Sequence, residues 1–306
     1  MFYLRYMLLL LAVLPYQTLS LSRIDHCIQK IKSYFQSHCV EKIDHKELST
    51  DSLHSVSICN QKGPITIKTG WKKKYLCLNT VTRAKNKNAL DAIKIIIDTK
   101  KPHHLAIDTQ YSNEHLSGTV EYELIIPTEL SIHLITKKGD IFVSDISGNI
   151  TLFTQKGKAT IVNTKNNITI ESCTDLYIEN ATGAIKALAH NNITIEHAHN
   201  NITATTKKGK INIHYKDLSA ADTVSLSTES GTIFLTLPLD SHATIHGLTA
   251  YGSILCEHYI TLQPLTTQLN TLAWNKLKKE VHGTINEGRT HISLSSLYGD
   301  IKILQS

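Results

Sequence analysis

The chain has 306 residues, of which 41% are hydrophobic and only 6% aromatic, and its formal net charge at pH 7 is +6. This apolar content is enough to bury a sizeable core and excludes an intrinsically disordered chain. Aromatic residues are sparse, and Ile, Thr and Asn recur throughout. That composition favours many short β-strands over helices that pack on aromatic anchors.

The N-terminal segment predicts export. Arg5 precedes an apolar run that ends at Val13, and small or polar residues follow as far as Ser22. This order is typical of a signal peptide, here residues 1–20, and the run is too short to span a bilayer comfortably. We therefore expect a protein of the periplasm or cell surface, with membrane association only through its N-terminus.

Residues 21–45 are predicted to form a helical extension. Apolar residues from Ile24 to Cys39 recur at every third or fourth position, which is the spacing of an amphipathic helix. We expect a short helix that caps the domain over residues 46–306. A helix lying on a membrane surface is the alternative, but acids and lysines are mixed on its polar face.

A cationic stretch lies between Lys62 and Lys101, where eleven Lys or Arg residues accompany only two acids. One interpretation is a surface for an anionic partner, and the other, which we favour, is a solvated face of a sheet. The candidate anionic-ligand surface consists of Lys72, Lys73, Lys74, Arg83, Lys85 and Lys87. Export counts against nucleic acid as the partner.

Turn-forming residues recur in steps of about nine residues, and a short alternating strand such as "NITLFTQ" follows each one. The positions are Gly139, Gly148, Gly157, Asn166, Asp175, Gly183, Asn192, Asn201 and Gly209. A meander of hairpins is the alternative, but hairpin loops vary in length and carry paired turn residues. The strict period instead predicts an all-β solenoid, or β-helix, in which two units make one coil and coils stack through parallel ladders. We expect Gly and Asn at the corners because both tolerate a positive φ.

The alternation also predicts which side chains face inward, and those residues are aliphatic. They are Ile141, Val143, Ile161, Ile168, Ile170, Ile193, Ile195, Ile211 and Ile213. One unit cannot bury its apolar face alone, so stability must come from stacking, with atypical ends as caps. We expect an N-terminal cap over residues 46–130 and repeat strands over residues 131–306.

Six cysteines in an exported chain could pair, and their connectivity stays open. Cys27 with Cys39, and Cys59 with Cys77, are nearest in sequence. Cys173 and Cys256 lie in strand-like segments, and we expect them to be small buried side chains because no Cys-x-x-Cys motif is present.

The histidines do not predict a metal site. His197 and His199 are two residues apart and should share one face of a strand, with Glu196 on the other, while His190 and His214 could approach from neighbouring units. Zinc needs three or four converging ligands, and the sequence shows at most a pair. We therefore expect no metal and no cofactor.

The acidic residues do not predict catalysis. Asp140, Asp145, Asp175 and Asp300 fall at turns or strand edges, where an aspartate normally bonds its own turn backbone. A glycan-active enzyme would need clustered acids in a groove lined by aromatic residues. No nucleophile elbow, phosphate-binding loop or dinucleotide fingerprint is present either, so we expect no enzymatic activity and no catalytic residues.

Four stretches, in this order, resemble the bacterial putative-adhesin family, a domain of unknown function with an adhesin-like β-solenoid. They are "GPITIKTGW" (63–71), "VEYELIIPTELSIHLITKKGDIFV" (120–143), "SGTIFLTLP" (230–238) and "GTINEGRTHISLSSLYGDIKIL" (283–304). The likeness covers about residues 50–305. The chain departs from the family where Asn-Asn-Ile-Thr replaces Gly-Asp-Ile in three units, and in its extension before residue 45. The resemblance implies an envelope protein with a role in adhesion and no catalytic residues to transfer.

The sequence thus predicts an exported, non-enzymatic cell-envelope β-solenoid that acts as an adhesin or surface-interaction module. Its partner would be an envelope or host surface polymer or protein, bound through many weak contacts along the stacked coils. A periplasmic structural scaffold is the first alternative, and a glycan-active β-helix enzyme is the second.

Overall fold

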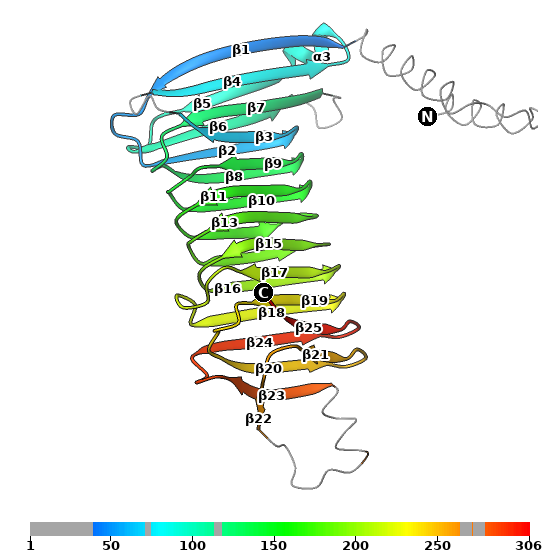
Figure 1. Ribbon diagram of the computed structural model, residues 1–306. Coiled ribbons are helices and arrows are strands. Elements are labelled where there is room, and N and C mark those ends of the chain that lie inside the picture. The colour runs from blue at the N-terminus through cyan, green and yellow to red at the C-terminus, as the bar shows by residue number, and fades with distance from the viewer. Residues whose placement is uncertain (1–38, 71–74, 113–117, 264–270, 272–278) are drawn as a thin grey trace, which may run out of the picture.

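The computed structural model describes residues 39–70, 75–112, 118–263, 271 and 279–306. The predicted signal peptide, most of the predicted helical extension, and Cys27, Lys72, Lys73 and Lys74 lie outside the described residues. The described chain is an elongated stack of short strands, arranged in two sheets that face each other across a thin core (Figure 1).

The two sheets run the length of the stack. Sheet A contains, in spatial order, β1 (Val40–Ser49), β4 (Tyr75–Ala84), β7 (Gly118–Ile126), β3 (Ile65–Thr69), β9 (Ile141–Ser144), β11 (Ala159–Thr164), β13 (Leu176–Ala181), β15 (Ile193–Ala198), β17 (Ile211–Tyr215), β19 (Ile233–Leu237), β25 (Ile301–Gln305) and β21 (Ile254–Cys256). Sheet B contains β22 (Thr261–Leu262), β23 (Glu280–Ile285), β20 (Ala243–Thr249), β24 (Thr290–Ser296), β18 (Thr223–Ser230), β16 (Ile202–Lys208), β14 (Ile185–Ala189), β12 (Ile168–Ser172), β10 (Ile150–Lys156), β8 (Ser131–Lys138), β2 (Ser55–Lys62), β6 (His104–Tyr111) and β5 (Ile93–Asp98).

The register of the central strands confirms the predicted solenoid. Ile150 of β10 pairs in parallel with Ile132 of β8 on one side and with Ile168 of β12 on the other, so one coil takes 18 residues. The next coil takes 17, because Ile168 pairs with Ile185 of β14. Each coil contributes one strand to each sheet, as two strand-turn units per coil require. The meander of hairpins is excluded here because these neighbouring strands run parallel.

The core is one continuous aliphatic cluster between the sheets. Every residue predicted to face inward is at most 1% exposed. Alternation along each strand places these side chains on the same face. Each fully buried Ile or Leu contributes about 1.5–3 kcal/mol of transfer free energy, so the stack is stabilised by many similar increments along its length.

The coils that come first and last along the chain do not lie at the ends of the stack. The first coil, β2 and β3, lies between the coil formed by β6 and β7 and the coil formed by β8 and β9. The last coil, β24 and β25, is likewise inserted beside β18 and β19, with β20 and β21 beyond it. Both chain-terminal coils are therefore covered on each side by other strands, and the ends of the stack are made by antiparallel strands such as β1, β5 and β23.

The prediction of a helix up to residue 45 is wrong at its C-terminal end. Residues 40–49 form strand β1, which pairs antiparallel with β4 along its whole length. Its apolar Ile43 is 69% exposed, so the helical spacing buries no face here, and cross-strand hydrogen bonding decides the conformation. The short helix α3 (Lys87–Asp91) is N-capped by Asn86, whose side chain accepts from the backbone N–H of Ala89. Within the described residues, no helix is long and apolar enough to cross a membrane.

The corner glycines are required for a different reason from the predicted one. Of the predicted turn residues only Gly209 has a positive φ, at 135°. Gly139 and Gly157 do not, yet a Cβ on Gly157 would lie 2.0 Å from the carbonyl oxygen of Gly139 in the coil beside it. The stacked backbones approach so closely that a side chain does not fit, and this approach recurs at Gly148 and Gly183.

Positive φ values instead form a column at the long corner, where the chain returns from sheet A to sheet B. Asp145, Asn163, Asn180 and His197 have φ between 54° and 62° in successive coils. Asn163 Nδ2 donates to Asp145 Oδ1, and Asn180 Nδ2 donates to Asn163 Oδ1, both at 3.0 Å. Short polar side chains tolerate this conformation and bond to one another along the stack.

Candidate functional site

The short corner leads from each sheet-B strand into the next sheet-A strand, and it carries a recurring pattern. In β8 and β10 the pattern is Thr-x-Lys-Gly, at residues 136–139 and 154–157, and it returns at residues 206–209. In β2 the same register holds Asn60, Lys62 and Gly63. The first residue of each pattern is buried. The lysine two positions later is the last residue of its strand, and it is exposed in Lys138, Lys156 and Lys208 and half-buried in Lys62.

The buried residue of the pattern bonds across to the neighbouring coil. Thr154 is fully buried, and its hydroxyl donates to the carbonyl oxygen of Gly139 at 2.9 Å. The same contact recurs through the stack: Thr136 to Gly63 at 3.4 Å, Thr228 to Gly209 at 3.4 Å, Ser296 to Gly231 at 3.0 Å and Thr249 to Gly299 at 2.8 Å. These hydroxyls donate to corner carbonyl oxygens that lie outside the paired strands. They therefore supply hydrogen bonds that hold the corner in position.

The lysines of the pattern lie in register on adjacent strands. Lys138 of β8 pairs with Lys62 of β2 on one side and with Lys156 of β10 on the other. Adjacent strands are about 4.8 Å apart, so three ammonium groups emerge from one edge of the sheet at the spacing of the coils. Lys207 and Lys208 of β16 stand at the same corner further along. We call Lys62, Lys138 and Lys156 the lysine column.

Two members of the lysine column, Lys138 and Lys156, are not paired with an acid in the part of the chain that the structure describes. Among the described residues no carboxylate lies within ion-pair distance of Lys138 or Lys156, and both side chains are exposed. Lys62 is half-buried with its Nζ 5.7 Å from the centre of the Tyr111 ring. Like charges in register on neighbouring strands repel each other. An anion bound along this edge would relieve that repulsion.

The predicted cationic surface is only partly described, and its arginine is engaged. Arg83 of β4 donates from Nε to Glu41 of β1 at 2.7 Å and from Nη1 to Glu121 of β7 at 2.9 Å. These hydrogen bonds, to Glu41 first, raise the pKa of Arg83 above its usual value. Lys85 and Lys87 are exposed beside it. The strands on either side of β4 therefore supply acids that the linear count of charges did not reveal.

The aspartates bond neighbouring coils rather than their own turns. Asp140 Oδ1 accepts the backbone N–H of Lys158 at 2.8 Å, and Asp175 Oδ1 accepts that of Asn192 at 3.2 Å. Asp300 Oδ1 accepts the backbone N–H of Ser253 at 2.8 Å and its hydroxyl at 2.9 Å. These two hydrogen bonds lower the pKa of Asp300. The prediction of an intra-turn bond was wrong because the next coil brings a backbone donor closer.

The histidines near residue 197 do not form a ligand set. A bulge in β15 places both Glu196 and His197 on the partly exposed face, contrary to the expected alternation. His214 Nδ1 lies 3.3 Å from Glu196 Oε2, and its ring centre is 5.6 Å from that of His197. His199 falls beyond the end of β15. In the part of the chain that the structure describes, no three ligand atoms converge here.

Cys59, Cys77, Cys173 and Cys256 are not joined to one another by disulfides. Cys59 lies in sheet B and Cys77 in sheet A, so these sequence neighbours do not meet. Cys173 is buried as predicted, and burial raises the pKa of its thiol to about 12. Cys256 is only partly buried, and burial raises the pKa of its thiol as well. Burial thus disfavours the thiolate at both positions, and the thiolate is the reactive form of cysteine.

No protein-family model matches the sequence. No curated protein matches it either.

Several solved structures are similar to this chain over most of its length. A putative adhesin from Bacteroides fragilis is 13% identical, with 86% of this chain and 97% of that chain covered and a TM-score of 0.39. A putative cell adhesion protein from Clostridium sporogenes is 10% identical, with coverages of 87% and 100% and a TM-score of 0.29. A putative lipid binding protein from Parabacteroides distasonis is 10% identical, with coverages of 87% and 94% and a TM-score of 0.33. At such identities and TM-scores the likeness transfers no ligand and no residue role.

Proposed function

We propose that this protein is an exported, non-enzymatic surface-interaction module that binds an extended anionic polymer of the cell envelope or host surface along the lysine column. The observation that carries this proposal is the register of Lys62, Lys138 and Lys156 on three adjacent strands. A linear polymer with regularly spaced charges can contact several such lysines at once. Weak single contacts then add to a useful affinity because the second and later contacts are intramolecular.

Two further features support a binding role without catalysis. Asp140, Asp175 and Asp300, the acids that a glycan-active enzyme would use, are engaged by backbone N–H groups of neighbouring coils. The corner that carries the lysine column is held by buried hydroxyls such as that of Thr154, so the backbone positions of the lysines are fixed. A preorganised array loses less conformational entropy on binding than a flexible one.

The test is binding of the full chain to immobilised alginate, a linear polymer with one carboxylate per sugar, with neutral dextran as the reference. We expect saturable, salt-sensitive binding to alginate alone, because ionic contacts at a surface are screened by salt. The double change Lys138→Ser/Lys156→Ser should weaken it about tenfold, since each exposed ionic contact contributes up to about 1 kcal/mol.

The matched control is Lys85→Ser/Lys87→Ser, which removes the same charge from the predicted cationic surface. We expect this variant to bind as the unmodified chain does. If it loses binding while Lys138→Ser/Lys156→Ser keeps it, the ligand surface lies at the N-terminal cap, and the change of Lys72, Lys73 and Lys74 to Ser tests that directly. Absence of binding to any anionic polymer would contradict the proposal and favour a structural scaffold.

A further inference from the structure

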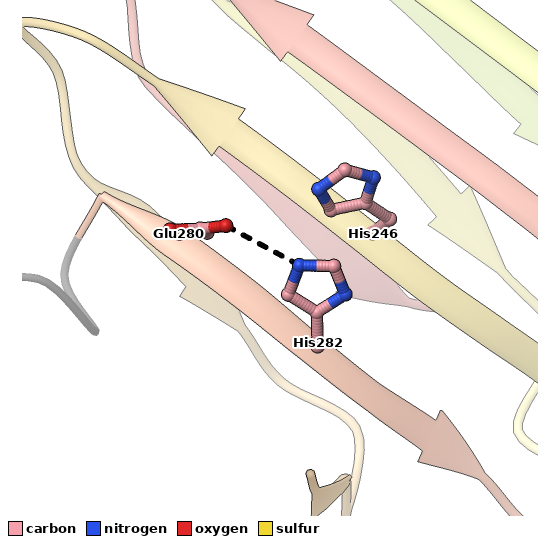
Figure 2. A group of neighbouring side chains, drawn as sticks. All are labelled: His246, Glu280 and His282. Atoms are coloured by element: carbon pink, nitrogen blue, oxygen red, sulfur yellow. Dashed lines mark hydrogen bonds and ion pairs between the residues drawn. The ribbon is translucent and has the colours of Figure 1, made fainter. Parts of the chain in front are cut away.

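We propose that His246, Glu280 and His282 form a binding site for one divalent transition-metal ion, with Zn²⁺ as the ion that suits this ligand set. These residues come from two strands that are far apart in the sequence, β20 and β23, and Figure 2 shows their side chains on one face of the sheet. They are the one group of three candidate ligands that converges within the described residues.

Strand pairing brings the two histidines together. β20 and β23 are antiparallel, with His246 directly opposite His282. Thr249 N donates to Lys279 O at 2.8 Å, so that pair is hydrogen-bonded. Because hydrogen-bonded and non-hydrogen-bonded pairs alternate, His246 and His282 form a non-hydrogen-bonded pair, the kind whose side chains lie closer.

Glu280 completes the group from the same strand as His282. The two residues are two positions apart, so their side chains leave the same face of the sheet. Glu280 Oε1 lies 3.3 Å from His282 Nε2. The imidazole rings of His246 and His282 are stacked with their centres 4.0 Å apart and their planes 22° apart. One ligand atom from each residue lies within 4.8 Å of the others.

Rotation of an imidazole ring would convert this arrangement into a metal site. Ligand atoms bound at 2.0–2.2 Å to one tetrahedral zinc are about 3.4 Å from one another, and the ion must lie in the plane of each imidazole. The stacked rings do not yet meet the second condition, so one ring must turn. Room exists for that turn, because His246 is exposed and the side chains of His282 and Glu280 are 31% and 24% exposed.

Among the described residues, the neighbours of the three ligands are compatible with a cation. Lys279 precedes Glu280, but its Nζ donates to Ala250 O at 2.8 Å. The neighbour of His246 on β24 is Ser293, which is uncharged. Two imidazole nitrogens and one carboxylate oxygen match the three protein ligands of an open zinc site, which leaves a fourth position for water or an exogenous ligand.

A bound ion would link strands β20 and β23 near the edge of sheet B. β23 begins at Glu280 and pairs with β20 on one side and with only the two residues of β22 on the other. Coordination by both strands adds a link between β23 and β20 that is independent of their hydrogen bonds. Metal binding to the folded chain therefore raises its stability by mass action.

The first experiment is a calorimetric titration of the full chain with ZnCl₂. We expect one ion per chain with saturable binding. His246→Ala and His282→Ala should each weaken it about tenfold or more, since even loss of an outer partner of a metal ligand costs about 10–100-fold. Glu280→Gln should also weaken it. The control is His214→Ala, which removes a histidine paired with Glu196 on the other sheet and should leave zinc affinity unchanged.

A second readout is thermal unfolding with and without ZnCl₂. Zinc should raise the midpoint of the unmodified chain and of His214→Ala but not that of the double variant His246→Gln/His282→Asn. Circular dichroism verifies that each variant is folded. Failure to bind one equivalent of zinc, or unchanged affinity in both His246→Ala and His282→Ala, would overturn the proposal. Lys138→Ser/Lys156→Ser should keep its zinc affinity, so the outcome is separate from that of polymer binding.

Discussion

At the scale of single residues, the stack is governed by how closely neighbouring backbones approach. Gly157 has no positive φ, so its glycine is not a conformational requirement. A Cβ there would meet Gly139 O at 2.0 Å and Thr154 Oγ1 at 2.7 Å, and the backbone atom cannot move aside without shifting the coil. Gly247 in β20 is different, because a Cβ there would meet only the flexible end of Ile254, at 3.4 Å.

These two glycines give a direct prediction. Gly157→Ala should lower the free energy of unfolding by about 1–3 kcal/mol, which is the usual range for overpacking. Gly247→Ala should leave it unchanged or raise it by up to about 1 kcal/mol, because alanine reduces the freedom of the unfolded chain. Urea unfolding of both variants beside the unmodified chain measures the difference. Equal effects of the two substitutions would contradict the close-approach explanation.

At the scale of elements, the coils are held by columns of equivalent side chains that run across the strands. The hydroxyl column of the short corner is one example, in which Thr154 at the end of β10 bonds the corner of the adjacent coil. Thr164 stands at the end of β11 in sheet A, and it is equally buried. Its hydroxyl has no hydrogen-bond partner among the described residues. Position within the coil, and not residue type, decides whether a buried threonine stabilises the fold.

Replacing each threonine by the isosteric valine separates the two cases. Thr154→Val leaves the carbonyl of Gly139 without its donor, and we expect a loss of about 1–2 kcal/mol in the free energy of unfolding. Thr164→Val removes an unsatisfied buried hydroxyl, so stability should be unchanged or higher. Both values come from chemical denaturation under one set of conditions. A destabilised Thr164→Val would mean that this hydroxyl has a partner in solution.

At the scale of the whole molecule, the stack is built from near-equivalent coils. Their order in space differs from their order in the sequence near both ends of the stack. The coil of β2 and β3 and the coil of β24 and β25 are each inserted between other coils. Contacts between segments distant in sequence therefore hold both ends. Ile233 and Ile301, for example, are in register on β19 and β25, although strands β20 to β24 lie between them in the chain.

Carboxylates spread along the stack predict acid sensitivity. The hydrogen bond from Lys68 lowers the pKa of Glu123, and hydrogen bonds from Ser219 and Ser253 lower the pKa values of Asp217 and Asp300. A carboxyl with a lowered folded pKa binds fewer protons when folded than when unfolded. Its contribution to the free energy of unfolding is therefore fully present above the pKa of the unfolded state, about 4. That contribution is lost as pH falls through the pKa of the folded state.

We accordingly expect the urea midpoint to be nearly constant from about pH 7 to 5 and to fall below about pH 4. The decrease is modest because Asp217 is exposed and Glu123 and Asp300 are partly exposed, so solvent screens their interactions. Asp300→Asn should show a shallower acid decrease than the unmodified chain. A midpoint that rises on acidification would contradict the assignment.

The sequence by itself determined the repeating part of the fold. A period of about nine residues, with aliphatic side chains at alternating positions such as Ile161 and Ile213, specified both the coil length and the inward face. This succeeded because strand alternation and the turn every half-coil are local properties. The lysine column was not predicted from the sequence. Each lysine precedes a corner glycine in the sequence, but only the register of the coils shows that the lysines lie side by side.

Only the tertiary structure decided what depends on segments remote in sequence. Residues 40–45 were predicted to end the helical extension but belong to strand β1, because β4 offers a partner along its whole length. Arg83 meets Glu41 and Glu121 from two different strands. His246 and His282 become neighbours through antiparallel pairing. Such contacts follow from long-range register, which local periodicity does not contain.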